Sequence, residues 1–394
     1  MRAEDFAPNA PGELIEIENG NVAFVPNPLP PTLEYDEAFI NALASANLAI
    51  GELKGTLQQL ANPYLLIRPF QLREAVASSQ IEGTQAELQE LVLFEAADAK
   101  PDATGELREV SNYVHALTYG AGQPPDREVS VSLIREMHQL LMQGVRGGDR
   151  NPGQLRTGQV YIAGQYHGIG SARFVPPPPE SVPVLLSDLQ TFLNTPSSIP
   201  ALVRLAISHY QFEAIHPFND GNGRVGRLLL PVLLVRWDVL RHPALYLSDF
   251  FNEYREVYIE RLWQVSSAGD WMGWIRFFVD AVSLQAQGTV GKTQDLLMLR
   301  NEYRATYQTS RSAGGLLRVI DRLFEFPAIS IPAIQRELDV TFPTASKWVL
   351  TLEEDGVLVE RTGQRKNRLY LATGIFDILN APPFYASGGA SPAS

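Results

Sequence analysis

The chain has 394 residues, enough for two or three domains, and its 45% hydrophobic and 19% charged residues are typical of a globular protein. It contains no cysteine, which excludes disulfides and thiolate metal sites. Its net charge of −12 argues against a protein that coats nucleic acid, and its longest apolar run is too short to span a bilayer. The N-terminus lacks the hydrophobic stretch of a signal peptide, so we expect a cytoplasmic protein with no membrane partner.

The first 34 residues are rich in proline and glycine, and we interpret them as an extended arm that crosses the surface. Periodic apolar residues predict a series of helices after this arm. Their expected ranges are 36–60, 70–81, 87–97, 106–119, 130–145, 183–193, 201–215, 247–267, 271–287 and 293–309. Between the fifth and the sixth helix, alternating residues over 156–162 and the turn-forming residues after them predict a β-hairpin, which taken alone is a structural connector.

The helix predicted over 70–81 ends in a short polar motif. Ser78 and Glu82 are four residues apart, so they share one face of the helix. Gly83 follows directly, where a helix can end or turn. Taken alone, this segment is typical of a solvated helix end.

The stretch HPFNDGNGRVGR, residues 216–227, carries an imidazole, a carboxylate, three glycines and two guanidiniums. Pro217 cannot continue the preceding helix, which places His216 at the C-terminal edge of that helix. The glycines of Gly221-Asn222-Gly223 allow successive backbone N–H groups to turn toward one point. A second helix is expected to begin near Asn222, with the positive end of its dipole at the same point. These features predict an anion site.

The charged residues of this stretch suit a polyphosphate with a bound metal ion. Arg224 and Arg227 are three residues apart on the first turn of the second helix, where both can reach phosphate oxygens. Asp220 is a hard oxygen ligand placed for Mg²⁺, which commonly binds one carboxylate together with substrate phosphates. His216 lies across the loop as a general base, because imidazole is half-titrated near neutral pH.

The stretch 216–227 resembles the signature of Fic-domain proteins, HPFx[D/E]GNGRxxR, and matches it at every fixed position. The resemblance implies a mainly α fold, a helical Fic core with a small β-hairpin flap, and an enzyme that moves the AMP part of ATP onto a protein hydroxyl. It implies catalysis by His216, a Mg²⁺ cofactor on Asp220, and ATP as substrate. The nucleotide-binding residues that it implies are Gly221, Asn222, Gly223, Arg224, Arg227 and, in the helix over 247–267, Tyr258. Tyr254 departs from the family pattern, since relatives often carry an asparagine there.

Two further segments take roles from the same resemblance. Ser78, Glu82 and Gly83 match the inhibitory-helix motif [S/T]xxxE[G/N] of autoregulated Fic proteins, whose glutamate pairs with the second signature arginine, here Arg227. A carboxylate cannot share that guanidinium with a triphosphate without strong repulsion between like charges. Residues 161–176 correspond to the flap, whose exposed edge holds a segment of the target protein by strand addition.

The pattern changes near residue 314. Helices over 315–326, 332–338 and 344–354, with strands over 357–360 and 368–371, resemble a winged helix-turn-helix domain. Residues 315–374 contain eight Lys and Arg and eight Asp and Glu, so the domain is neutral and has a weak electrostatic attraction for DNA. Contact with a protein, or with a second copy in a homodimer, therefore stays open beside DNA binding.

These observations predict five parts, which are an N-terminal arm and helices with the inhibitory motif over 1–105, a Fic catalytic core over 106–290, a connecting helix over 291–313, a winged helix-turn-helix over 314–376 and a disordered tail over 377–394. The predicted function is an autoinhibited protein adenylyltransferase that modifies a Tyr, Ser or Thr hydroxyl of a target protein or of itself. Removal of AMP at the same site, with Glu82 orienting a water, is an alternative enzyme. A nucleotide-sensing, DNA-binding regulator is the alternative from another class.

Overall fold

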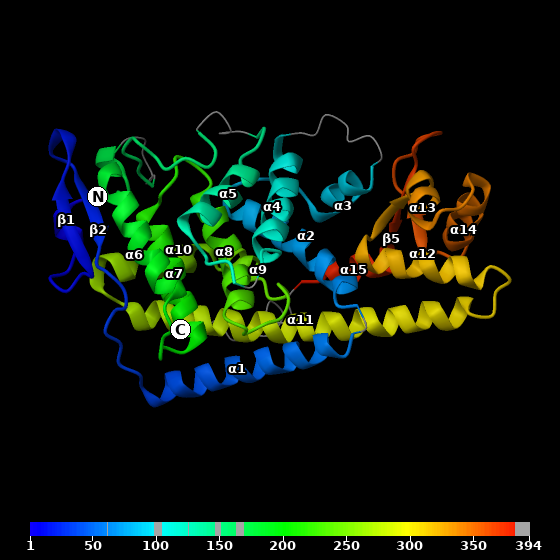
Figure 1. The fold of residues 1–394 in the computed structure, drawn as a ribbon, viewed down its shortest axis with the longest axis horizontal. Coiled ribbons are helices and arrows are strands. Elements are labelled where there is room, and N and C mark those ends of the chain that lie inside the picture. The colour runs from blue at the N-terminus through cyan, green and yellow to red at the C-terminus, as the bar shows by residue number, and fades with distance from the viewer. Residues whose placement is uncertain (61, 98–104, 125, 146–150, 163–168, 383–394) are drawn as a thin grey trace.

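The computed structural model describes residues 1–60, 62–97, 105–124, 126–145, 151–162 and 169–382. The expected mainly α fold is confirmed, and the helices are arranged along an elongated body (Figure 1). The longest helix, α11 (Trp271–Tyr307), has 37 residues and therefore spans about 55 Å. α1 (Glu37–Gln58) packs along α11 and buries Phe39, Leu53 and Leu57. These two helices form the base on which the rest of the core lies.

The N-terminal segment is a β-hairpin, so its interpretation as an extended arm is wrong. After a short 3-10 turn, η1 (Ala3–Asp5), β1 (Gly12–Glu16) pairs antiparallel with β2 (Val22–Pro26), and the turn η2 (Glu18–Gly20) joins the two strands. The buried ring of Phe24 lies 5.4 Å from the ring of Phe6 and 5.8 Å from that of Phe174. Its backbone N–H donates to the Val175 carbonyl at 2.9 Å. Burial of Phe24 thus fixes both the register of the hairpin and its place in the fold.

The rest of the core consists of shorter helices that precede α11 in the chain. They are α2 (Tyr64–Ile81), α3 (Leu88–Ala96), α4 (Gly105–Ala121), α5 (Val131–Leu141), α6 (Val182–Asn194), α7 (Ala201–Ile215), α8 (Asn222–Arg236), α9 (Ser248–Glu253) and α10 (Arg255–Ala268), with a short turn, η4 (Pro179–Ser181), before α6. Nearly every residue of α7 is buried, because α6, α8 and α11 pack against it. The indole N–H of Trp274 in α11 donates to the Ala206 carbonyl of α7 at 2.9 Å. α7 is therefore a rigid support for the residue that follows it, His216.

Three of the predicted helices are divided differently in the structure. The range 247–267 forms two helices, α9 and α10, because Tyr254 between them has φ −106° and ψ 39°, outside helical values. Residues 271–287 and 293–309 form the single helix α11. The packing of α1 along α11 outweighs the weak helix propensity of Gly288 and Gly291, so the expected break does not occur.

Only the base of the predicted flap, residues 161–176, can be described, because residues 163–168 lie outside the described residues. An isolated antiparallel bridge joins Ile162 to Phe174, and the turn η3 (Ile169–Ser171) comes shortly before Phe174. Arg173 forms an ion pair with Glu260 of α10 at 2.5 Å. The bridge and the ion pair hold this segment against α10.

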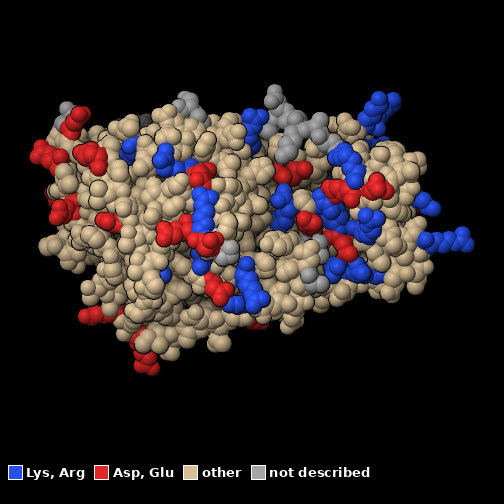
Figure 2. All heavy atoms as spheres, in the orientation of Figure 1, with Lys and Arg blue, Asp and Glu red and all other residues tan. Residues whose placement is uncertain are grey.

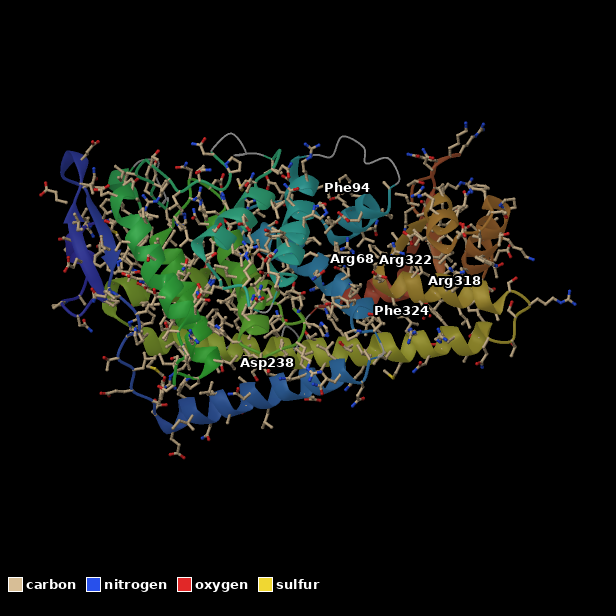
Figure 3. All side chains as sticks on the ribbon, in the orientation of Figure 1. Arg68, Phe94, Asp238, Arg318, Arg322 and Phe324 are labelled. Carbon is tan, nitrogen blue, oxygen red and sulfur yellow. The ribbon has the colours of Figure 1, made fainter. Side chains whose placement is uncertain are left out.

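The C-terminal part packs on the outer side of α2 and α3. It consists of α12 (Ala313–Glu325), β3 (Ala328–Ser330), α13 (Ile331–Leu338), α14 (Phe342–Glu354), β4 (Leu358–Glu360), β5 (Leu369–Ala372) and α15 (Thr373–Asn380), and its antiparallel sheet has the order β3-β5-β4. Arg68 of α2 and Arg322 of α12 meet at this junction (Figure 3), where both guanidiniums lie over the ring of Phe326. The predicted start of a disordered tail at residue 377 is wrong, since the apolar residues Ile375 and Leu379 are buried and hold α15 in place.

Charge is distributed unevenly over the surface. Asp and Glu gather at the end formed by β1 and β2, and Lys and Arg are most frequent at the opposite end, around α12 to α14 (Figure 2). Residues 1–37 contain eight Asp and Glu and one Arg, so much of the net charge of −12 belongs to the N-terminal segment and not to the C-terminal part. Within the described ranges, no helix combines the length and the apolar character that crossing a membrane requires.

Candidate active site

The loop between α7 and α8 turns sharply at two residues. His216 caps α7 in the left-handed conformation, with φ 49° and ψ 62°, and Gly221 precedes α8 with φ 77°. The buried side chain of Asn222 closes the loop, because its Oδ1 accepts from the Phe218 N–H at 2.8 Å and its Nδ2 donates to the Phe218 carbonyl at 2.9 Å. The amide of Asn222 therefore shapes the loop and does not face open space, unlike a phosphate-binding side chain.

Arg156 supports this loop through hydrogen bonds to backbone carbonyls, a role that the sequence did not reveal. Its Nε donates to the His216 carbonyl at 2.8 Å, and its Nη2 donates to the Pro177 carbonyl at 2.5 Å and the Ile215 carbonyl at 3.3 Å. The residue is almost completely buried. Burial lowers the pKa of Arg156 to about 10, so the guanidinium stays charged at neutral pH at the C-terminal end of α7.

His138 of α5 holds the other side of the loop. Its Nδ1 accepts from the Gly153 N–H at 2.7 Å, so Nε2 carries the proton and donates to the Asp220 carbonyl at 3.0 Å. Its ring stacks on Phe218 with the centroids 3.8 Å apart. Burial lowers the pKa of His138 to about 4, which keeps the imidazole neutral. No local sequence pattern points to this residue, because its partners lie in distant segments.

His216 is placed to act as a base. Its Nδ1 lies 3.3 Å from the Glu213 carbonyl, an acceptor only, so Nδ1 carries the proton and Nε2 keeps its lone pair. Burial lowers the pKa of His216 to about 4, although the hydrogen bond to Glu213 acts in the opposite direction. The imidazole is therefore neutral and able to accept a proton at neutral pH.

A cavity of about 320 Å³ brings together Glu82, His216, Gly223, Arg227 and Tyr258, which are five of the residues singled out in the sequence. Apolar side chains of α10 form one wall, and the base of the flap segment forms another. The other predicted residues do not line this cavity; they are Ser78, Gly83, Asp220, Gly221, Asn222 and Arg224. The structure thus unites the base, the second arginine and the glutamate of α2 in one space.

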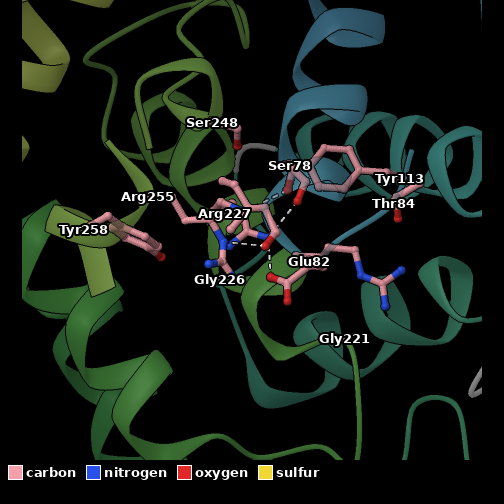
Figure 4. A network of polar contacts seen from close by, with 12 residues as sticks. Ser78, Glu82, Thr84, Tyr113, Gly221, Gly226, Arg227, Ser248, Arg255 and Tyr258 are labelled. Carbon is pink, nitrogen blue, oxygen red and sulfur yellow. Dashed lines mark hydrogen bonds and ion pairs between the residues drawn. The ribbon is translucent and has the colours of Figure 1, made fainter. Parts of the chain in front are cut away.

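Arg227 is the centre of the polar network in this cavity (Figure 4). Its Nε donates to Ser78 Oγ at 2.8 Å, and its Nη2 donates to the Ser78 carbonyl at 2.9 Å and to Glu82 Oε1 at 2.6 Å. The side chain of Arg227 is 2% exposed, whereas that of Glu82 is 42% exposed. Burial acts to raise the pKa of Glu82, but Arg227 outweighs it and the pKa lies below its ordinary value. Gly83 ends this segment in the left-handed conformation, with φ 95°.

The carboxylate of Glu82 lies directly against the first turn of α8. A Cβ atom on Gly223 would stand 2.3 Å from Glu82 Oε1, so only glycine permits this approach. The helix N-terminus, which the sequence assigned to a phosphate, therefore holds a protein carboxylate here, in keeping with the affinity of such positions for negative charge.

Arg224 and Asp220 lie beside the cavity and close to each other. Arg224 is nearly buried, with Nη1 3.5 Å from Glu109 Oε2 and Nη2 3.6 Å from Asp220 Oδ1. Asp220 is 37% exposed and accepts from the Gly221 N–H at 2.7 Å. The two arginines of the signature therefore have separate carboxylate partners, Glu109 for Arg224 and Glu82 for Arg227.

Tyr258 forms part of the cavity wall, and its hydroxyl points into the core. The hydroxyl donates to Nε2 of His209 at 2.8 Å, since Nδ1 of that histidine faces the Gly226 carbonyl at 3.3 Å. Burial lowers the pKa of His209 to about 3, as suits a core histidine, and raises the pKa of Tyr258. Arg255 also lines the cavity and donates to the Ile81 carbonyl at 2.9 Å.

Comparison with protein families agrees with this geometry. The Fic/DOC family N-terminal model matches residues 40–122, and the Fic/DOC family model matches residues 128–234. The chain belongs to the Fic/DOC family. The stretch 216–227 lies within the Fic region, and Ser78 to Gly83 lie within the Fic N-terminal region.

Protein adenylyltransferase fic-1 of Caenorhabditis elegans is 39% identical to this Fic protein over 114 residues, 28% of this chain and 20% of that protein. A relative from Aquifex aeolicus is 31% identical over 188 residues, 46% of this chain and 53% of that protein. The chain thus spans about half the length of these curated relatives, or less. A Fic family protein from Desulfovibrio desulfuricans G20 shares the fold, with a TM-score of 0.57 at 23% identity over 88% of this chain and 99% of that chain.

Proposed function

We propose that this Fic protein transfers AMP from ATP to a Tyr, Ser or Thr hydroxyl of a target protein or of itself. One observation carries the proposal, namely that a neutral His216 and the anion-binding side chain of Arg227 face one cavity. Several relatives are named protein adenylyltransferases, among them those of C. elegans and Aedes aegypti.

In this reaction the hydroxyl of the target gives its proton to Nε2 of His216 as its oxygen attacks the α-phosphorus of ATP. The new bond joins that oxygen to the α-phosphorus, the bond to the bridging oxygen of the β-phosphate breaks, and pyrophosphate leaves. Arg227 and the backbone N–H groups at the start of α8 stabilise the negative charge on the phosphates. The apolar wall from α10 limits water in the cavity, which strengthens these interactions.

Asp220 suits a Mg²⁺ ion that binds together with the nucleotide. Its carboxylate is partly exposed, and its backbone is fixed by the hydrogen bond from His138. Among the described residues there is no cluster of three or more metal-binding side chains, but Mg²⁺ commonly binds one carboxylate plus substrate phosphates. When bound, the ion neutralises phosphate charge, and Asp220 is the residue that would hold it.

We further propose that Glu82 keeps the enzyme in a resting state. The carboxylate occupies the N-terminal end of α8 and holds Arg227 at 2.6 Å, so a triphosphate that uses the same groups has to displace it. Ser78 supports the resting state by accepting from the same guanidinium. The ion pair of Glu82 with Arg227, and its place against Gly223, support this part of the proposal.

The target would enter at the flap segment, residues 161–176. Tyr161 is exposed at the rim of the cavity, and the bridge between Ile162 and Phe174 offers a β edge next to it. An extended segment of the target added to this edge would bring its hydroxyl close to His216.

The C-terminal part is proposed to be a winged helix-turn-helix that follows the Fic core, with α14 as its recognition helix and residues 361–368 as its wing. The order of its elements and the exposure of the wing residues Arg361, Arg365, Lys366 and Arg368 support this assignment. Its partner is DNA, another protein or a second copy of the chain. A gel-shift titration with duplex DNA, beside light scattering of the protein alone, separates these partners.

A second enzyme activity is favoured by the partly exposed carboxylate of Glu82 in the cavity of His216. A carboxylate there can orient a water toward an AMP-modified side chain, which would reverse the transfer. Incubation with an AMP-modified protein and no ATP tests this reaction, and release of AMP by wild type but not by Glu82→Gly supports it.

Mass spectrometry after incubation with ATP and Mg²⁺ tests the proposed transfer directly. AMP is expected on the Glu82→Gly protein, and its amount should fall to background when His216→Ala is added. His115→Ala is a matched control, because this histidine is exposed on α4 and does not line the cavity. Absence of AMP from the chain and from every protein of a bacterial lysate incubated with Glu82→Gly would overturn the proposal.

A further inference from the structure

Two carboxylates lie against two glycines of α8, and both interact with Arg227. A Cβ atom on Gly223 would stand 2.3 Å from Glu82 Oε1, and a Cβ atom on Gly226 would stand 2.2 Å from Glu213 Oε1. The glycines are three residues apart, so they lie on neighbouring positions of the same helical turn. The first of these carboxylates has its role in the resting state, and the second has none so far.

Glu213 differs from Glu82 in its partners. Its side chain lines the same cavity, and its Oε1 is buried without a hydrogen-bond partner among the described residues. Its backbone carbonyl faces Nδ1 of His216, which fixes the main chain of this residue one helical turn before the base. A buried carboxyl oxygen without a partner is rare in folded proteins, so this acid at the wall of a binding cavity calls for a functional explanation.

We propose that Glu213 controls whether the site accepts a triphosphate. As a neutral acid it admits the negative charge of the phosphates beside Arg227, and as a carboxylate it excludes that charge. This inference rests on the proposed use of ATP. With Glu82 displaced by ATP, a charged Glu213 would still compete with the phosphates for the guanidinium of Arg227. As a neutral acid it has an O–H that can donate to a phosphate or ribose oxygen.

The surroundings of Glu213 favour its titration near neutral pH. Burial raises the pKa of Glu213 to about 7, with Arg227 acting to lower it and Glu82 to raise it. The charged and titratable groups that face it or share its cavity are Glu82 at the end of α2, Tyr161 and Arg173 of the flap segment, Tyr210 and His216 of α7, Arg227 of α8, and Arg255 and Tyr258 of α10. The pKa of His216 is about 4, that of Glu82 is lowered, and those of Tyr210, Arg227 and Tyr258 are raised. Glu213 is therefore the member of this set that changes charge around pH 7.

The proposal predicts that ATP binding takes up a proton at Glu213. Since the bound state favours the neutral acid, affinity for ATP should fall as pH rises through the pKa of the free protein. For a group with a pKa of about 7 that stays protonated in the complex, the fall between about pH 6 and about pH 8 is about tenfold. Glutamine has the shape of glutamic acid and stays neutral, so the ATP affinity of Glu213→Gln should not show this fall with pH.

The experiment is a calorimetric titration with ATP and Mg²⁺ at both pH values, in two buffers of different ionisation enthalpy. Titration of ATP itself is common to both proteins and cancels in the ratio of wild type to Glu213→Gln. That ratio should change about tenfold over the range, and near pH 7 wild type should take up about half a proton more than the variant.

Asp280→Asn is the matched control, because burial also raises the pKa of Asp280 and this residue of α11 does not line the cavity. It should keep the wild-type dependence on pH. Equal dependence in wild type and Glu213→Gln, or its loss in Asp280→Asn alone, overturns the proposal for Glu213 and leaves AMP transfer untouched. Absence of ATP binding by every protein at both pH values overturns the proposed function together with this inference.

Discussion

The guanidinium of Arg227 donates to the carboxylate of Glu82 at 2.6 Å, although 145 residues separate them in the chain. The position of Glu82 is set further back in α2. Glu74, two turns earlier, accepts from the Ser248 hydroxyl at 2.5 Å and the Tyr113 hydroxyl at 2.9 Å, which ties α2 to α9 and α4. The ion pair is therefore held by the core of the protein on both sides.

Replacement of Glu82 by Gly should increase transfer, because Arg227 is then free for the phosphates of ATP. A shift of a few kcal/mol in the productive population corresponds to an increase of roughly 10²-fold or more. Self-modification at saturating ATP is the measurement. Arg227→Ala should be less active than wild type, since it removes the phosphate ligand together with the inhibitory contact. Equal rates for wild type and a folded Glu82→Gly would rule out inhibition by this residue.

Ser78→Ala should give a smaller gain than Glu82→Gly. The hydroxyl of Ser78 accepts from Nε of Arg227, but the Ser78 carbonyl and Glu82 still hold Nη2 in the variant. A severalfold increase in the same assay is expected. Ser79→Ala is a close control, because the buried hydroxyl of Ser79 has no hydrogen-bond partner in the described structure. A gain in Ser79→Ala equal to that in Ser78→Ala would show that the effect is not transmitted through Arg227.

The sequence predicted much of this site because its signals are local. The residues from His216 to Arg227 lie in one stretch, where proline ends one helix and glycines begin the next. The pairing of Glu82 with Arg227 followed only from the resemblance to autoregulated Fic proteins. Nothing in the sequence indicates that the polar groups of Asn222 and Tyr258 bind Phe218 and His209 inside the protein.

Other features depend on contacts between distant segments and have no local signal. Arg156 and His138 reach carbonyls of the active-site loop from 60 and 82 residues away. The N-terminal hairpin, in contrast, has a local signal in the sequence. Its two apolar stretches, LIEI and VAFV, flank an Asn-Gly pair, which is a strong hairpin pattern.

His216→Ala should abolish transfer while ATP binding stays within a few-fold of wild type. Loss of a general base typically costs about 10² to 10⁴ in rate, and the phosphate contacts remain in the variant. Single-turnover transfer and ATP titration, both in the Glu82→Gly background, separate the two effects. Transfer at the unchanged rate would exclude His216 as the base.

The pH dependence of transfer offers a separate test of the same residue. Because burial lowers the pKa of His216 to about 4, the base is neutral at every pH above that value and gains a proton only below it. At saturating ATP, the single-turnover rate should therefore hold its plateau down to about pH 5. A fall in rate centred near pH 6.5, the ordinary value for histidine, would contradict this environment.

Asp220→Ala should lose the dependence of transfer on Mg²⁺, and additional ATP should not restore the rate. The carboxylate would hold an ion that positions the phosphates, so its loss affects the reacting geometry and not just binding. Rates measured over a series of Mg²⁺ concentrations, in the Glu82→Gly background, provide the test. Asp238→Ala is a suitable control, since this aspartate lies at the far end of α8, as Figure 3 shows. Unchanged metal dependence in Asp220→Ala would move the ion to other residues.

Arg156→Met should destabilise the protein and impair transfer together. The guanidinium donates hydrogen bonds to the carbonyls of Ile215, His216 and Pro177. Among the described residues, no other side chain donates to these three carbonyls. A buried polar group left without a partner costs about 1–3 kcal/mol, so the free energy of unfolding should fall by about 3 kcal/mol or more. Urea unfolding followed by circular dichroism measures this change.

Arg156→Lys distinguishes the charge of this residue from its geometry. Lysine keeps a cation at the C-terminal end of α7, but a single ammonium group cannot reproduce the planar fork that reaches three carbonyls. Its stability should lie between those of wild type and Arg156→Met, and its transfer rate should still be low because the backbone of His216 is no longer held in place. The proposed support of His216 by Arg156 would be refuted by two results together. The free energy of unfolding of Arg156→Met would lie within about 0.5 kcal/mol of that of wild type, and the variant would transfer AMP at the full rate.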